Sequence, residues 1–142
     1  MTVPPTESSP TAPSAKTAAH RVTFHGAEGK PVLVLAHGFG TDQSAWQHVL
    51  PALTQNYRVV TYDHAGAGPN AAQTFDADLY SDIESYADDL LQILDELGIQ
   101  DCRYVGASMG GAVGMLAAIE QPQRFRKLVL LGASPRYLNA PG

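Results

Sequence analysis

The sequence predicts an α/β fold: an open, mostly parallel sheet with helices on both of its faces. Short apolar runs alternate along the chain with longer segments whose apolar residues recur every three or four positions. One short run, residues 31–36 (PVLVLA), is apolar throughout, which is typical of a strand covered on both faces. Helices that pack on the sheet would connect such strands in parallel.

The bulk composition fits a single soluble domain. The chain has 142 residues, of which 44% are hydrophobic and 16% charged, and its net charge is −5. This acidic balance provides no electrostatic footprint for nucleic acid or an anionic membrane, and no apolar run approaches the roughly 18 residues of a membrane-spanning helix. Cys102 is the only cysteine, so an intrachain disulfide is excluded and a cytoplasmic location is expected.

The first 19 residues differ in composition from the rest of the chain. They are rich in Pro, Ser, Thr and Ala, and they lack the apolar segment of a secretory signal. We therefore expect residues 1–19 to be a disordered leader and residues 20–142 to form the folded domain.

Five short strands are expected from runs of apolar and β-branched residues bounded by turn-forming residues. They lie at residues 21–24, 31–36, 58–62, 103–105 and 127–131. The third is followed by residues 63–70 (DHAGAGPN), whose glycines and proline indicate a loop.

Three helices are expected between these strands. The first covers residues 43–53 after a cap at Thr41 or Asp42. One face of this helix collects its large apolar residues, namely Trp46, Val49, Leu50 and Leu53. The last helix covers residues 110–121 and ends before Pro122.

The second helix carries a recognisable start and stop. Ser81 and Glu84 have the spacing of a capping box, and apolar residues follow at intervals of three and four up to Leu97. Gly98 stands where a left-handed residue commonly ends a helix.

Residues 106–110 (GASMG) match the pattern G-x-S-x-G at a predicted junction between a strand and a helix. In a nucleophile elbow the serine occupies a strained turn there, and small residues two positions before and after it let strand and helix approach closely. Gly106 and Gly110 meet that need, so Ser108 is a candidate nucleophile.

A serine nucleophile also needs two N–H donors for the oxyanion that forms on attack. The backbone N–H of Met109, directly after the serine, is one candidate. The backbone N–H of Phe39, within residues 37–40 (HGFG) after the strand at 31–36, is the other. Both motifs fall at the carboxyl ends of predicted parallel strands, where open sheets bind ligands. The loop position of Phe39 also predicts that its side chain lines the pocket.

Other polar and aromatic residues are expected to have structural roles. His37 precedes Ser108, whereas the base of this motif follows the serine, so we expect His37 to brace its loop. Asp63 is expected to organise its loop through local Asx-type bonds. Trp46 and Tyr86, at helical spacing, are expected in the core. The remaining histidines are expected at the surface or in loops, namely His20, His25, His48 and His64.

Five segments together resemble the α/β-hydrolase superfamily, and within it the branch that contains the bacterial stress-response regulator RsbQ and the plant strigolactone and karrikin receptors. They read LAHGFGTDQSAW, YRVVTYDHAGAGPN, YADDLLQILDELGI, YVGASMGGAVGMLAAIEQP and FRKLVLLGASPRYLN. The resemblance implies that Ser108 is the catalytic serine and that Phe39 and Met109 are the oxyanion-hole donors. It also implies small, rather apolar ester or enol-lactone substrates, signalling partners, and neither a metal nor an organic cofactor.

The sequence departs from that family in three ways. Ala107 stands where the family usually has histidine before the serine. The helical lid that normally follows GASPRYLN is absent. No Asp and no His follows Ser108, and Glu120 is the only acid there, although the superfamily orders its triad Ser, Asp, His. The chain thus resembles an N-terminal half, which we expect to be nearly inactive alone and to leave an unpaired, apolar sheet edge after Leu131.

Two other functions are compatible with these residues. A chain without its base could act as a non-catalytic signalling or binding protein with the same fold. Gly106, Gly110 and Ala112 also come within one residue of the glycine-rich loop of dinucleotide-binding dehydrogenases. That loop normally follows the first strand of its domain, whereas this one follows the third or fourth.

Overall fold

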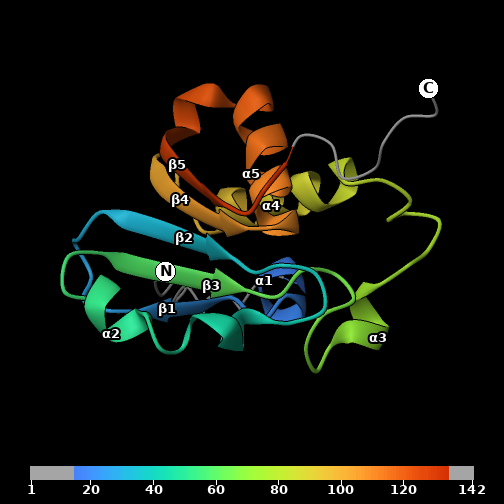
Figure 1. The fold of residues 1–142 in the computed structure, drawn as a ribbon, viewed down its shortest axis with the longest axis horizontal. Helices are drawn as coiled ribbons and strands as arrows, with labels where there is room; N and C mark the ends of the chain where they lie inside the picture. Colours follow the sequence, from blue (N-terminus) through green and yellow to red (C-terminus); the bar gives the residue numbers. More distant parts are fainter. Residues whose placement is uncertain (1–14, 135–142) are drawn as a thin grey trace, which may run out of the picture.

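The computed structural model describes residues 15–134, and its centre is a five-stranded sheet in the order β1-β3-β2-β4-β5 (Figure 1). The strands are β1 (Thr23–His25), β2 (Val32–Ala36), β3 (Arg58–Tyr62), β4 (Cys102–Ala107) and β5 (Phe125–Leu131). β1 pairs antiparallel with β3, and all other neighbours are parallel. The predicted fold class is confirmed.

One helical segment, α1 (Ala15–Ala19), precedes the first strand, and the others connect the strands. These others are η1 (Gln43–Trp46), α2 (Leu50–Leu53), α3 (Ala71–Thr74), α4 (Glu84–Glu96), α5 (Met109–Glu120) and η2 (Pro122–Arg124), where η denotes a 3₁₀ helix. None of the helices within residues 15–134 is both long enough and apolar enough to cross a membrane.

The two faces of β2 show why its sequence is apolar throughout. Val34 and Ala36 pack into a core cluster with residues of α4 and α5. Leu33 and Leu35 point to the opposite face and pack with Trp46 of η1. Because side chains alternate along a strand, a strand with helices on both faces needs apolar residues at every position.

The helix predicted at residues 43–53 is not continuous. Asp42 caps η1 by accepting a hydrogen bond from the Ser44 N–H at 2.8 Å, and a separate short helix starts at Leu50. Pro51 has no N–H to donate to the preceding turn, so it stands in the first turn of a new helix. Val49, predicted on the buried face, lies at this break and is exposed.

The capping box predicted for α4 does not form. The helix begins at Glu84, and the side chain of Asp82, not Ser81, accepts a hydrogen bond from the Ser85 N–H at 3.3 Å. The helix therefore starts too far along the chain for the Ser81 side chain to cap its first turn. The other end agrees with the prediction, since Gly98 follows the helix with φ of 68°.

The predicted disordered leader extends too far towards the domain. Residues 1–14 lie outside the described part of the chain, but residues 15–19 form the helix α1. Lys16 forms an ion pair of 2.5 Å with Asp89 of α4, and the Thr17 N–H donates to Glu96 at 3.1 Å. These long-range contacts order a segment whose composition alone favours disorder.

β5 lies at an edge of the sheet, next to β4 (Figure 1). Among the described residues no strand pairs with its outer side, and Val129, Leu130 and Leu131 are exposed. The expectation of an unpaired, apolar edge is confirmed for this part of the chain.

Candidate active site

Ser108 occupies the sharp turn between β4 and α5. Its backbone has φ of 52° and ψ of −116°, a region that residues other than glycine rarely adopt. Two backbone hydrogen bonds anchor the turn. The Ser108 N–H donates to the Leu131 carbonyl oxygen at 2.8 Å, and the Gly111 N–H donates to the Ser108 backbone carbonyl oxygen at 2.9 Å. The serine is exposed to solvent. This is the strained, outward-facing geometry that a nucleophile elbow requires.

The glycines on either side of Ser108 permit this turn. A Cβ atom on Gly106 would lie 2.4 Å from the Gly110 carbonyl oxygen, and a Cβ atom on Gly110 would lie 2.3 Å from the Ala36 carbonyl oxygen. Both distances are too short for real atoms, so only glycine allows β4, α5 and β2 to approach this closely.

The loop at residues 37–40 lies beside the elbow. β2 and β4 are parallel neighbours, with Ala36 paired to Gly106, so the segments that follow them meet at one edge of the sheet. A Cβ atom on Gly38 would lie 3.4 Å from the Ser108 Cβ atom. The two predicted motifs, about 70 residues apart in sequence, are therefore in contact.

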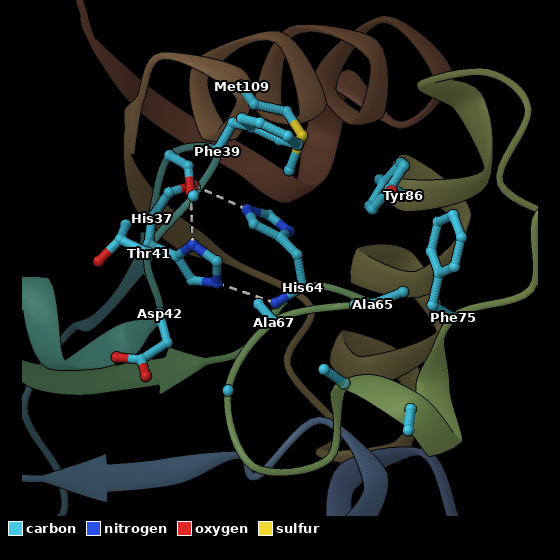
Figure 2. Close-up of a pocket in the computed structure, with 16 residues that line it drawn as sticks. His37, Phe39, Thr41, Asp42, His64, Ala65, Ala67, Phe75, Tyr86 and Met109 are labelled. Carbon is cyan, nitrogen blue, oxygen red and sulfur yellow. Dashed lines mark hydrogen bonds between the residues drawn. The ribbon is translucent and has the colours of Figure 1, made fainter.

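An open pocket of about 850 Å³ reaches the elbow at Met109, the residue directly after Ser108, but Ser108 itself is not among its lining residues (Figure 2). Phe39 and Met109 lie at one side of this pocket and Phe75 and Tyr86 at another. Phe39 is 88% exposed, and Asp42 is the only carboxylate among the described residues that line the pocket. Within residues 15–134, the lining consists of His37, Gly38, Phe39, Gly40, Thr41, Asp42, His64, Ala65, Gly66, Ala67, Gly68, Ala71, Ala72, Phe75, Tyr86 and Met109.

Two aromatic lining residues, Phe75 and Tyr86, were not predicted for the pocket. Phe75 follows the short helix α3, inside a stretch that gave no periodic signal. Tyr86 was expected in the core on its helical spacing, but it lines the pocket as well as packing against the core. Helical spacing alone does not tell a core position from a pocket position. Tyr86 reaches the pocket because α4 lies next to the loop after β3. Trp46 is buried as predicted.

His37 and His64 form a buried pair at the base of the pocket, with ring centroids 4.4 Å apart. The His64 N–H donates to His37 Nε2 at 3.0 Å, and His37 Nδ1 lies 2.8 Å from the Gly38 carbonyl oxygen. His64 Nε2 lies 2.8 Å from the His37 carbonyl oxygen (Figure 2). His37 thus braces its loop, as predicted, and both of its ring nitrogens are engaged by backbone groups.

Burial lowers the pKa of both histidines. The pKa of His64 falls to about 3, mainly through burial and secondarily through the neighbouring His37, and burial also lowers the pKa of His37. Both imidazoles are therefore neutral at physiological pH, which matches their engagement as uncharged hydrogen-bonding groups.

Asp63 organises its surroundings, but through distant partners rather than the local bonds predicted. Its buried carboxylate accepts hydrogen bonds from the Gln43 N–H at 3.0 Å, the Gln43 side-chain amide at 3.1 Å and the Arg21 guanidinium at 3.1 Å. A Cβ atom on Gly68 would collide with this carboxylate. These bonds tie the segment before β1 and the start of η1 to the loop after β3.

The other histidines differ in environment. His20 is buried, and its Nδ1 lies 2.8 Å from the Asp63 carbonyl oxygen. Its burial was not anticipated, because α1 was not predicted. His25 bonds to Thr61 at 2.9 Å, and His48 is exposed. Within residues 15–134, no group of three or more His, Cys, Asp or Glu side chains is placed to hold a metal ion.

A family model described as alpha/beta hydrolase fold matches residues 31–141. The chain is 54% identical over 111 residues to the strigolactone esterase D14 of Arabidopsis thaliana, covering 78% of this chain and 42% of that protein. It is 51% identical over 112 residues to the karrikin insensitive 2 receptor IA of Petunia hybrida, covering 79% of this chain and 41% of that protein.

A solved structure, the enol-lactonase from Burkholderia xenovorans LB400, superposes with a TM-score of 0.74 at 31% identity, covering 81% of this chain and 44% of that one. The chain thus spans about two fifths of the length of these relatives. The elbow at Ser108, the adjoining loop at residues 37–40 and these similarities agree with one another. The chain belongs to the α/β-hydrolase fold family, in the branch of the strigolactone and karrikin receptor-like proteins.

Proposed function

We propose that this chain provides the nucleophile and the oxyanion-binding groups of a serine hydrolase. The observation that carries the proposal is the backbone of Ser108, held at φ of 52° and exposed beside the loop at residues 37–40. In this proposal Ser108 Oγ attacks a carbonyl carbon, and the backbone N–H groups of Phe39 and Met109 stabilise the resulting oxyanion.

Small, rather apolar esters or lactones are the proposed substrates. The pocket offers aromatic and small apolar side chains and no cationic residue among those described, so it favours neutral compounds over anions. The names of similar proteins, an esterase for strigolactone and an enol-lactonase, support the same class.

The base and the acid of the triad are proposed to come from polypeptide outside residues 1–142. No Asp or His follows Ser108 in the sequence, and Glu120 is exposed at the far end of α5. The ring nitrogens of His37 are engaged by backbone groups. Without a base, only the residual acceleration from substrate binding and the oxyanion hole is expected.

Hydrolysis of p-nitrophenyl acetate tests this proposal. The 142-residue chain alone is expected to act no faster than its Ser108→Ala variant. Co-expression with the C-terminal half of a similar esterase, carrying Asp and His, is expected to give hydrolysis that the same variant abolishes. A complex that forms but hydrolyses the ester equally well with either residue at position 108 contradicts the proposal.

For this hydrolase we also propose a cytoplasmic location and a part in stress-response signalling. A non-catalytic signalling or binding role with the same fold is the alternative. The name of one similar protein, the karrikin insensitive 2 receptor IA, favours it. This alternative predicts a monodisperse 142-residue protein whose melting temperature rises with a small lactone equally in wild type and Ser108→Ala. It also predicts no hydrolysis when the C-terminal half is supplied.

A further inference from the structure

The two buried histidines of the pocket determine the direction of the peptide groups next to them. His37 directly follows β2 and His64 is the second residue after β3, and the two strands are parallel neighbours. Their imidazoles therefore emerge at the same edge of the sheet, beneath the loop that contains Gly38 and Phe39 (Figure 2).

The hydrogen bonds fix the tautomer of each ring. A backbone N–H can only donate, so His37 Nε2, 3.0 Å from the His64 nitrogen, is the unprotonated acceptor. The proton of His37 is therefore on Nδ1, which donates to the Gly38 carbonyl oxygen at 2.8 Å. A carbonyl oxygen can only accept, so His64 Nε2 carries the proton that it donates to the His37 oxygen at 2.8 Å.

These bonds hold two consecutive carbonyl groups, those of His37 and Gly38, towards the imidazoles. Among the described residues no peptide bond is cis. In a planar trans peptide the N–H of the following residue points opposite to the carbonyl oxygen. The N–H of Gly38 and the N–H of Phe39 consequently point away from the two rings.

The side of the loop that faces away from the histidines adjoins the elbow. A Cβ atom on Gly38 would lie 3.4 Å from the Ser108 Cβ atom and 3.3 Å from the Ala107 oxygen. Within residues 15–134, no backbone hydrogen bond is found for the Phe39 N–H. The loop thus has its carbonyl groups satisfied on one side and a free donor on the other.

We propose that His64 is a positioning residue, which acts through His37 to aim the backbone N–H of Phe39 away from the protein interior. His64 contacts His37 in two ways. Its backbone N–H fixes the tautomer of the His37 ring, and its own ring donates a hydrogen bond that holds the His37 carbonyl. The use of that N–H as an oxyanion donor rests on the proposed function, whereas its orientation does not.

The orientation can be measured without substrate. Residual dipolar couplings of a weakly aligned, ¹⁵N-labelled 142-residue protein report the direction of each N–H bond. His64→Leu keeps the backbone N–H, but it removes the ring that holds the His37 carbonyl and that packs on the His37 imidazole. We therefore expect the coupling of Gly38 to change directly and that of Phe39 to change through the released His37 ring, while those of β2, β3 and β4 stay at their wild-type values. His64→Gln is expected to retain the wild-type couplings, because its side-chain amide reaches about as far as Nε2 and can donate to the His37 oxygen.

His25→Leu is the matched control. It also removes a histidine that makes one hydrogen bond, to Thr61 on the neighbouring strand, and it should leave the loop couplings unchanged. Unchanged couplings of Gly38 and Phe39 in a folded His64→Leu variant would overturn the proposal, as would changed couplings in a folded His64→Gln variant.

The ring tautomers provide a second measurement if the leucine variant does not fold. Long-range ¹H–¹⁵N spectra of the wild type are expected to show His37 protonated at Nδ1 and His64 at Nε2. The opposite tautomer at either ring would contradict the proposal.

Kinetics provide a third measurement if the chain hydrolyses ester once the C-terminal half of a similar esterase is supplied. In that complex, His64→Leu should lower kcat by about 10- to 100-fold with little change in KM. Hydrolysis that fails while the couplings behave as expected would count against the proposed function alone.

Discussion

The carbonyl oxygen of Ala36 lies so near to the Cα atom of Gly110 that a methyl group on that glycine would approach it to 2.3 Å. Gly110→Ala must therefore displace buried backbone of β2 or α5. We expect a loss of about 2–4 kcal/mol in the free energy of unfolding. Urea denaturation measures it. Gly38→Ala, where the nearest atom is 3.3 Å away, is the graded comparison and should cost clearly less. Equal losses would show that the close approach is not the cause.

The conformation of Ser108 predicts that removing its Cβ atom stabilises the protein. At φ of 52° and ψ of −116° a side chain is strained, and glycine is not. Ser108→Gly is therefore expected to be more stable than Ser108→Ala by about 1 kcal/mol, after allowing for the greater freedom of glycine in the unfolded chain. Both variants lack the hydroxyl group, so the comparison isolates the backbone. A more stable alanine variant would mean that the turn carries no strain.

The ion pair between Lys16 and Asp89 predicts that α1 contributes to the stability of the domain. The Asp89 carboxylate is buried and also accepts a hydrogen bond from the Tyr80 hydroxyl at 2.7 Å, so losing Lys16 leaves a buried charge with only that hydroxyl and His20 Nε2, 3.8 Å away, beside it. Lys16→Gln is expected to cost about 1–3 kcal/mol, measured by thermal or urea unfolding. The same substitution at the exposed Lys127 should change stability by less than about 0.5 kcal/mol.

The buried histidine pair predicts that stability falls in mild acid. The pKa of His64 is about 3 in the folded protein against 6.5 as its ordinary value, so the unfolded chain takes up the proton first. The stabilisation is fully present above pH 6.5 and is lost as the pH falls from there towards 3. Between pH 7.5 and pH 5 we expect a loss on the order of 2 kcal/mol from this group.

Urea denaturation at several pH values measures this effect. His64→Gln should flatten the profile between pH 7.5 and pH 5, whereas His48→Gln, at an exposed histidine, should leave it unchanged. A profile as steep in His64→Gln as in the wild type would assign the loss to other groups.

The sequence was most informative where the structure depends on residues close to one another along the chain. The strand at residues 58–62 and the elbow at Ser108 follow from local patterns, namely apolar runs and glycines two residues on either side of the serine. Gly98 ended α4 for an equally local reason, because few other residues tolerate a positive φ.

The features that escaped prediction depend on partners far along the chain. α1 is held by Lys16 on Asp89, 73 residues away, and the carboxylate of Asp63 is occupied by Gln43 and Arg21. His20 is buried only because α1 packs on the domain. No window of local sequence contains both members of these pairs, so composition and periodicity could not reveal them.

The edge of β5 has a consequence for what this part of the protein can associate with. Within residues 15–134, no strand pairs with the outer side of β5, and Val129 and Leu131 are exposed there. Such a surface favours the addition of another strand, and chaperones and proteases recognise surfaces of this kind while they stay uncovered. A polypeptide that adds a strand to β5 would therefore also shield this part of the protein from them.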